Sequence, residues 1–209
     1  MTRPIDTAAA TLAETAAALY ARGWLEGTAG NLSIRLPGGE TALITASGVS
    51  KGSITTADMV EVRIDNARPV HDGAPRPSAE TTIHTALYQL SAESHAVVHA
   101  HPPYATATAI LAARRGDDTV TFTDLEIIKG LGLADPSQVV VPVFDNHAHV
   151  PLIADAVGDR ITADAPPVML IGNHGATTWG PTLDIARNRM ECLEAMCQLM
   201  WLVDRSCHQ

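Results

Sequence analysis

Apolar residues along the chain follow two different spacings, one typical of helices and one typical of strands. A spacing of three or four residues, as between Ile83 and Leu87, predicts a helix. Gly23 is expected to stop the first helix, and Ser78, which follows Pro77, is expected to be the N-terminal cap of the second. The predicted helices are residues 7–22, 76–90, 103–114, 151–161 and 181–205.

Shorter apolar or alternating stretches predict the strands. Gly38 and Gly39 join the first two as a hairpin. The early strands follow one another directly, whereas helices separate the later ones, which favours a mainly antiparallel or mixed sheet flanked by helices. We therefore expect an α/β fold in a single domain, residues 1–209. The predicted strands are residues 31–36, 41–46, 59–64, 95–101, 139–144 and 166–180, the last running into a glycine-rich turn.

Composition narrows the classes of function. The 209 residues are 46% hydrophobic, enough for one sizeable core, and the net charge of −9 argues against nucleic-acid binding. No apolar run approaches the roughly 20 residues of a membrane span, and "MTRPIDTAAA" lacks the apolar centre of a secretion signal. The three cysteines follow no metal or disulfide spacing. We expect a cytoplasmic protein without a membrane partner.

Three histidines have the pattern of a metal site. In "AVVHAH", His99 and His101 lie two residues apart at the end of an apolar strand, so both rings point the same way from Cα atoms about 6.6 Å apart. Two satisfied histidines at a strand end would look the same. His174, between glycines in "GNHGATTWG", supplies a third ligand. Glu80, in the first turn of a predicted helix, is either a carboxylate that stabilises the helix dipole or a functional group, as a metal ligand or a proton carrier. Three histidines with a carboxylate or water suit zinc.

A second pair, His147 and His149 in "DNHAHVP", is the alternative metal site. No apolar strand runs directly into it and Pro151 follows, so we interpret it as a loop in which the two rings need not converge. The remaining histidines are single and are expected to be structural or exposed. They are His71, His84, His95 and His208.

Two segments are suited to an anion. Residues 27–35 and 45–52 are rich in glycine, serine, threonine and asparagine, so their backbone N–H groups and hydroxyls could surround a phosphate, although turns have the same composition. Lys51, one of only two lysines, adds a charge, and Ser78 at a helix start adds a donor. Together they suggest a phosphorylated substrate.

Glu126 and the second lysine, Lys129, lie three residues apart in "TDLEIIKGLG". Such a pair is usually a surface ion pair on a helix. A catalytic carboxylate is the functional interpretation of Glu126.

The segments "GNLSIR", "TASGVSKG", "RPSAETTIH", "VVHAHPP" and "GNHGATTWG" occur in this order over nearly the whole chain. In this they resemble the class II aldolase/adducin family, and "DLEIIKG" is most similar to its sugar-phosphate dehydratase branch. The resemblance implies an α/β/α sandwich around a largely antiparallel sheet. It also implies a homotetramer with active sites at subunit interfaces.

The resemblance further implies roles for particular residues. Zinc would be bound by His99, His101 and His174, and Glu126 would be the acid/base, while Glu80 is a ligand, a proton carrier or an orienting group. The residues in the phosphate-binding stretches are Asn31, Ser47, Gly48, Lys51 and Ser78.

Other members of the family leave alternatives open. An aldolase or a 4-epimerase acting on fuculose- or ribulose-type phosphates needs the same metal, so the histidines do not separate these reactions. A non-catalytic scaffold, as in adducin head domains, is expected to lack the metal histidines, and the intact set argues against it.

Overall fold

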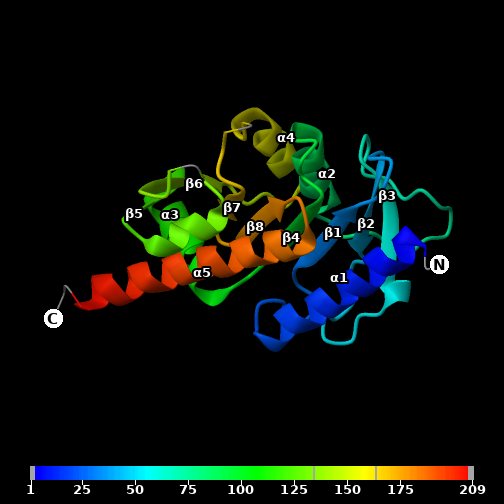
Figure 1. The fold of residues 1–209 in the computed structure, drawn as a ribbon, viewed down its shortest axis with the longest axis horizontal. Coiled ribbons are helices and arrows are strands. Elements are labelled where there is room, and N and C mark those ends of the chain that lie inside the picture. Colours follow the sequence, from blue (N-terminus) through cyan, green and yellow to red (C-terminus); the bar gives the residue numbers. More distant parts are fainter. Residues whose placement is uncertain (1–2, 134, 163, 207–209) are drawn as a thin grey trace.

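The computed structural model describes residues 3–133, 135–162 and 164–206, and it contains one eight-stranded sheet between two layers of helices (Figure 1). The strands are β1 (Asn31–Arg35), β2 (Thr41–Thr45), β3 (Met59–Arg63), β4 (Ala96–Ala100), β5 (Thr119–Thr123), β6 (Gln138–Phe144), β7 (Val168–Ile171) and β8 (Gly175–Gly180). The α-helices are α1 (Pro4–Ala21), α2 (Thr81–Leu90), α3 (Pro103–Arg115), α4 (Pro151–Arg160) and α5 (Leu183–Ser206). Two 3-10 helices are η1 (Thr56–Asp58) and η2 (Glu126–Leu131).

The strand order is β3-β2-β1-β4-β8-β7-β6-β5. Neighbouring strands are antiparallel except β6 and β7, which are parallel. The mainly antiparallel sheet expected from the order of elements is therefore confirmed. β4 and β8, which are far apart in sequence, lie side by side at the centre of the sheet.

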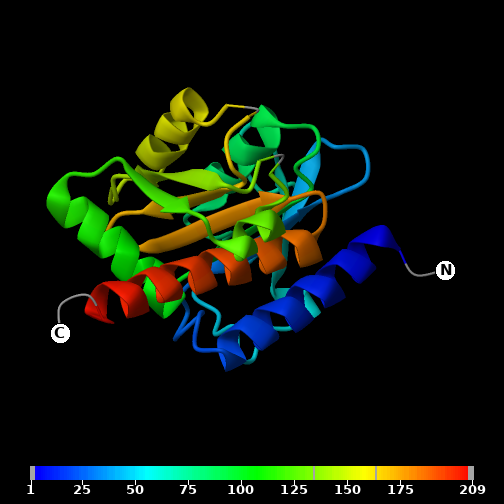
Figure 2. The ribbon, with the colours of Figure 1, turned by 60° about the vertical axis from the view of Figure 1, so that its left-hand side comes forward.

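Helices cover both faces of the sheet, as expected for a three-layer α/β/α sandwich. α2 and α4 pack on one face, and α1, α3 and α5 pack on the other (Figure 2). Alternating strand residues supply both cores. Val97 and Met169 belong to the core under α2 and α4, and Val98 and Leu170 belong to the core under α1, α3 and α5. Each core is therefore a layer of apolar side chains between the sheet and its helices.

Two strands differ from the sequence prediction. The pattern did not predict β5, although "TVTFT" consists of β-branched and aromatic residues that favour strands. Residues 166–180, expected to be one strand that runs into a glycine-rich turn, contain two strands, β7 and β8, joined by a tight turn at residues 172–174. Asn173 adopts a φ of 55° there, a left-handed conformation that asparagine tolerates better than most residues.

The start of α2 also differs from the prediction. The helix begins at Thr81 with Glu80 at its N-cap, so Ser78 is not the cap. Ser78 forms a turn instead: its carbonyl accepts from the N–H of Thr81 (3.2 Å), and its Oγ accepts from the N–H of Glu80 (3.3 Å). This turn directs the Glu80 side chain away from the helix end, with which it makes no capping hydrogen bond.

No described helix is long and apolar enough to cross a bilayer. Cys192 and Cys197 lie in α5 and are free cysteines. Cys207 and His208 lie outside the described residues.

Candidate metal centre

The three histidines predicted to bind metal converge at one end of the sheet. His99 is near the C-terminal end of β4, His101 follows that end, and His174 directly precedes β8. Because β4 and β8 are antiparallel neighbours, the end of one lies beside the start of the other. The three ring centroids are 4.8–5.0 Å apart, and one ligand atom from each ring lies within 4.8 Å of the others.

Gly175 leaves room for this convergence, and a backbone hydrogen bond helps to position His101. A Cβ atom on Gly175 would lie 2.6 Å from Cδ2 of His101, so only glycine allows the His101 ring to approach β8. The N–H of His101 donates to the carbonyl of Trp24 (2.9 Å), which holds the residue to the segment between α1 and β1. The sequence around His174 therefore shapes the position of His101.

Glu80 completes the cluster. Its Oε2 lies 3.2 Å from Nε2 of His99, and its Oε1 lies 3.0 Å from Nε2 of His174. The amide of Asn31 donates to Oε2 of Glu80 (2.5 Å). Glu80 is 7% exposed, so this carboxylate is held almost out of solvent against the histidines.

The spacing of these atoms fits a small divalent ion. Nε2 of His99 lies 3.0 Å from Nε2 of His101. Two nitrogen ligands on a tetrahedral zinc, each at about 2.0–2.1 Å, are about 3.3 Å apart. Together with His174, these imidazoles could hold such an ion, and Glu80 could be a fourth ligand or a carboxylate beside the ion.

Burial sets the protonation of the cluster. Burial lowers the pKa of His99 to about 3, so its imidazole is neutral at pH 7 and one ring nitrogen is free to bind metal. Burial alone would raise the pKa of Glu80, but His99, His174 and the Asn31 amide outweigh it, so this pKa lies below its ordinary value. The site therefore presents an ionised carboxylate beside neutral imidazole.

A cavity of about 290 Å³ opens beside the cluster and contains every residue that the sequence assigned to phosphate binding. It is walled by the start of β1, by the turn after β2 and by the segment before α2. The predicted residues that line it are Asn31, Ser47, Gly48, Lys51, Ser78, Glu80, His101 and His174. The structure thus brings the anion-binding segments and the histidines into one place.

The loop after β2 offers donors to this cavity. Within the described part of the chain, the backbone N–H groups of Gly48, Val49 and Ser50 donate no hydrogen bond. Lys51 is 1% exposed, and its Nζ donates to the carbonyls of Thr28 (3.1 Å) and Val49 (2.9 Å), which leaves one of its three N–H donors for a ligand. Lys51 therefore also ties together the two loops that wall the cavity.

Glu126 is not part of this cavity. It begins η2, next to β5 at the edge of the sheet, and β5 is three strand positions, about 14 Å, from β8. Its side chain is 85% exposed and pairs with Lys129 at 2.7 Å. Within one chain, the acid/base proposed from the sequence is separated from the histidines.

The other histidines lie outside the cluster. His147 and His149 are exposed in the loop between β6 and α4, as the sequence suggested. His71 is exposed and 3.3 Å from Glu61, and His95 is exposed. His84 is buried in α2, where its Nδ1 is 2.7 Å from Oγ of Ser33.

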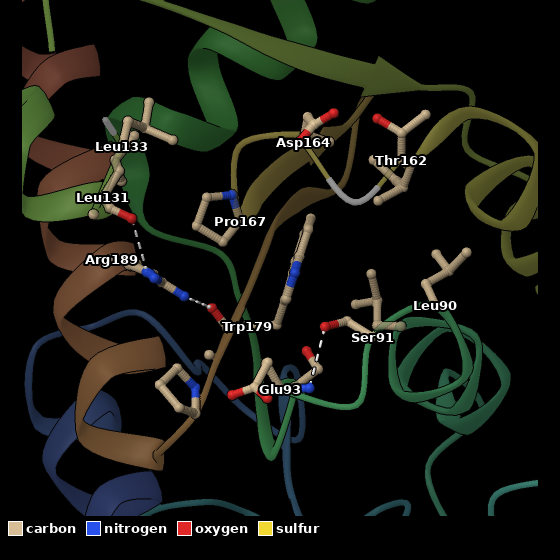
Figure 3. A pocket seen from close by; sticks show the side chains of 17 residues that line it. Leu90, Ser91, Glu93, Leu131, Leu133, Thr162, Asp164, Pro167, Trp179 and Arg189 are labelled. Carbon is tan, nitrogen blue, oxygen red and sulfur yellow. Dashed lines mark hydrogen bonds between the residues drawn. The ribbon is translucent and has the colours of Figure 1, made fainter. Parts of the chain in front are cut away.

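A second cavity of about 540 Å³ lies at the other end of the central strands (Figure 3). Trp179 and Pro167 form part of its wall, and Arg189 donates there to the carbonyls of Leu131 (3.1 Å) and Trp179 (2.6 Å). None of the predicted site residues lines it. The larger cavity is therefore separate from the metal centre.

Sequence reasoning missed two features of the site. Thr177 lies with its Oγ1 3.0 Å from Nδ1 of His99, but the sequence did not predict a strand starting at Gly175 that would have brought it there. The contact between Asn31 and Glu80 was also missed.

Two buried side-chain atoms of the site, Oδ1 of Asn31 and Nδ1 of His174, have no hydrogen-bond partner in the described residues.

The fold and the histidine centre are those of a class II aldolase-like protein. Residues 10–201 match the "Class II Aldolase and Adducin N-terminal domain" family, and the chain belongs to this family. The domain limits of 1–209 expected from the sequence extend beyond this match and stay a prediction.

Two relatives and one solved structure show which members of the family this chain is similar to. One relative is a probable bifunctional methylthioribose-1-phosphate isomerase/methylthioribulose-1-phosphate dehydratase of Nocardia farcinica. It is 50% identical over 91% of this chain, and the chain spans only 35% of that protein's length. Methylthioribulose-1-phosphate dehydratase of Microcystis aeruginosa is 39% identical over 88% of this chain and 89% of its own. L-fuculose-1-phosphate aldolase of Thermus thermophilus is 28% identical, with a TM-score of 0.73 over 96% of this chain and 95% of the aldolase.

Proposed function

We propose that the chain is a zinc-dependent dehydratase that converts 5-methylthioribulose 1-phosphate to 2,3-diketo-5-methylthiopentyl 1-phosphate, a step of methionine salvage. The observation that carries this proposal is the convergence of three histidines and Glu80 beside a cavity lined by Lys51 and the loop after β2. The names of the Nocardia and Microcystis relatives support the choice of substrate. A cytoplasmic homotetramer is part of the same proposal.

His99, His101 and His174 are the residues that would hold the zinc. When bound, the metal supplies a Lewis acid that withdraws charge from the C2 carbonyl and so makes the proton on C3 acidic. Neutral imidazoles suit this role because they bind the ion without cancelling its charge.

The phosphate would lie against the free N–H groups of residues 48–50 and the remaining donor of Lys51. Backbone N–H groups and an ammonium are the usual partners of a phosphate dianion. Asn31 and Ser78 line the same cavity, and the unpartnered Oδ1 of Asn31 is an acceptor for a substrate hydroxyl. These contacts fix C3 and C4 relative to the catalytic carboxylate.

The proton steps need one carboxylate that first accepts and then donates a proton. In the proposed sequence Glu126 takes the proton from C3, the C4–O bond breaks, and Glu126 returns the proton to the departing hydroxyl, which leaves as water. The resulting enol then tautomerises to the 2,3-diketone. No oxidant or second substrate is required.

Glu126 can perform these steps only if another copy of the chain brings it to the cavity, because in its own chain it is on an edge segment away from the histidines. Its exposure of 85% leaves it free to enter a neighbour's site. Contacts between the η2 edge of one subunit and the metal end of the next would be heterologous, and repeated contacts of this kind form a ring when the rotation between subunits closes. This supports the homotetramer with interface active sites.

A sugar-phosphate aldolase or 4-epimerase is the second candidate. Glu80 already lies within the metal cluster of a single chain, so it provides a carboxylate without a neighbour. The similarity to the Thermus L-fuculose-1-phosphate aldolase fits this alternative.

Incubation of the zinc-loaded protein with each substrate separates the two candidates. The dehydratase should form the diketone from 5-methylthioribulose 1-phosphate and leave L-fuculose 1-phosphate intact. Cleavage of L-fuculose 1-phosphate into two fragments, with the methylthio sugar untouched, would establish the aldolase instead.

A further inference from the structure

Three buried polar side chains lie in a row across the centre of the sheet. The strand register pairs Asn31 of β1 with His99 of β4, and His99 with Thr177 of β8. Side chains of directly paired residues point to the same face of a sheet. Asn31 and Thr177 therefore lie on either side of the metal ligand His99.

The two neighbours hold different parts of the metal centre. Asn31 donates to the carboxylate of Glu80, whereas Oγ1 of Thr177 lies 3.0 Å from Nδ1 of His99. Thr177 is 0% exposed. Among the described residues, its hydroxyl has the His99 imidazole as its hydrogen-bond partner. Its hydroxyl therefore contacts neither solvent nor the cavity.

The next residue, Thr178, shows what an ordinary buried threonine does in this strand. It is also 0% exposed, but it points to the opposite face and donates from Oγ1 to the carbonyl of Ala186 in α5 (2.7 Å). That contact attaches a helix to the sheet. Thr177 instead contacts a side chain that converges on the metal centre.

We propose that Thr177 is a positioning residue for the metal ligand His99. A neutral imidazole has one N–H and one lone pair, and Nε2 of His99, which faces His101 and Glu80, needs the lone pair in order to bind the metal. The ring proton is then on Nδ1 and is donated to Oγ1 of Thr177. This hydrogen bond fixes both the tautomer and the plane of the ring, as partners of metal-bound histidines commonly do.

The inference rests on the metal-binding part of the proposed function, and zinc affinity tests it. Thr177→Val has the same shape without the hydroxyl, and Thr177→Ser keeps the hydroxyl. We expect Thr177→Val to bind zinc about 10- to 100-fold more weakly in competition with a chromogenic chelator, and Thr177→Ser to bind like the wild type. Thr178→Val, which loses a buried hydrogen bond of similar length, should keep wild-type zinc affinity.

Unchanged zinc affinity of Thr177→Val, or an equal loss in Thr177→Ser, would overturn the proposal. If Thr177→Val does not fold, ¹H–¹⁵N correlation spectra of the zinc-loaded wild type decide the question: Nδ1 of His99 should carry the proton, and a metal-bound Nδ1 would overturn the role of Thr177. Failure of the metal site itself has a different signature, because wild-type protein and His99→Ala would then bind zinc equally weakly.

Discussion

The amide of Asn31 and the carboxylate of Glu80, 49 residues apart in the chain, are joined by a hydrogen bond of 2.5 Å. The bond connects the start of β1 to the residue that precedes α2, and it directs the carboxylate toward His99 and His174. Asn31 thus contacts the metal cluster as well as the cavity in which phosphate binding is proposed. Glu80 is held in place before any ligand arrives.

Glu126→Gln should separate metal binding from proton transfer. The amide keeps the size of the side chain and removes the titrating group, so kcat for dehydration should fall about 10²-fold or more while zinc content is unchanged. Steady-state kinetics and metal analysis of the same sample measure both. Near-normal dehydration would move the proton chemistry to Glu80.

Mixed assemblies provide the control for the position of Glu126. Unfolding and refolding an equal mixture of His99→Ala and Glu126→Gln chains should restore about a quarter of the wild-type sites if each site combines the histidines of one copy with Glu126 of another. Neither variant alone should recover. No gain of activity in verified mixed assemblies would show that Glu126 does not act in a neighbour's site.

Lys51 should contribute to substrate binding more than to metal binding. Lys51→Met keeps an apolar stem and removes the ammonium, so KM for the phosphorylated substrate should rise about 10-fold or more, since hydrogen bonds to charged groups contribute about 1.5–3 kcal/mol. Zinc content should not change. A wild-type KM in Lys51→Met would leave Lys51 only its contacts with Thr28 and Val49.

Much of the fold followed from local patterns. All five α-helices were predicted from local sequence, and His99 and His101 were placed together because strand geometry alone orients residues two apart. The third ligand was found because glycines flank it. Such features depend on neighbours in sequence, which is why a single chain reveals them.

The missed features depend on pairing between distant strands. Thr177 contacts His99 only because β8 is a separate strand whose register matches β4, and the register is set by tertiary packing. Ser78 was expected to cap α2, but the helix begins three residues later. Ser78 forms a turn instead, in which it accepts hydrogen bonds from the N–H groups of Glu80 and Thr81. The position of Glu126 away from the cavity could not be predicted, because helical spacing to Lys129 says nothing about where η2 packs.

The buried His84 should make stability depend on pH. Burial lowers its pKa from 6.5 to about 4, so between these pH values the unfolded chain binds a proton that the folded chain does not. The free energy of unfolding should therefore fall as pH is lowered through this window, by about 3 kcal/mol for a shift of this size. Denaturant unfolding with a chelator present, from pH 7 to 4, measures the dependence without the metal.

His84→Gln should lose this part of the pH dependence, whatever its stability at pH 7. Identical slopes in His84→Gln and wild type would mean that His84 is not the group that titrates on unfolding.

The metal content of purified protein tests the central assignment most directly. We expect one zinc ion per chain in the wild type and in His147→Ala, and loss of the ion in His99→Ala and His174→Ala, measured by elemental analysis after equilibrium dialysis. Full occupancy in His99→Ala and His174→Ala, with loss in His147→Ala, would contradict the assignment and move the metal to the loop between β6 and α4.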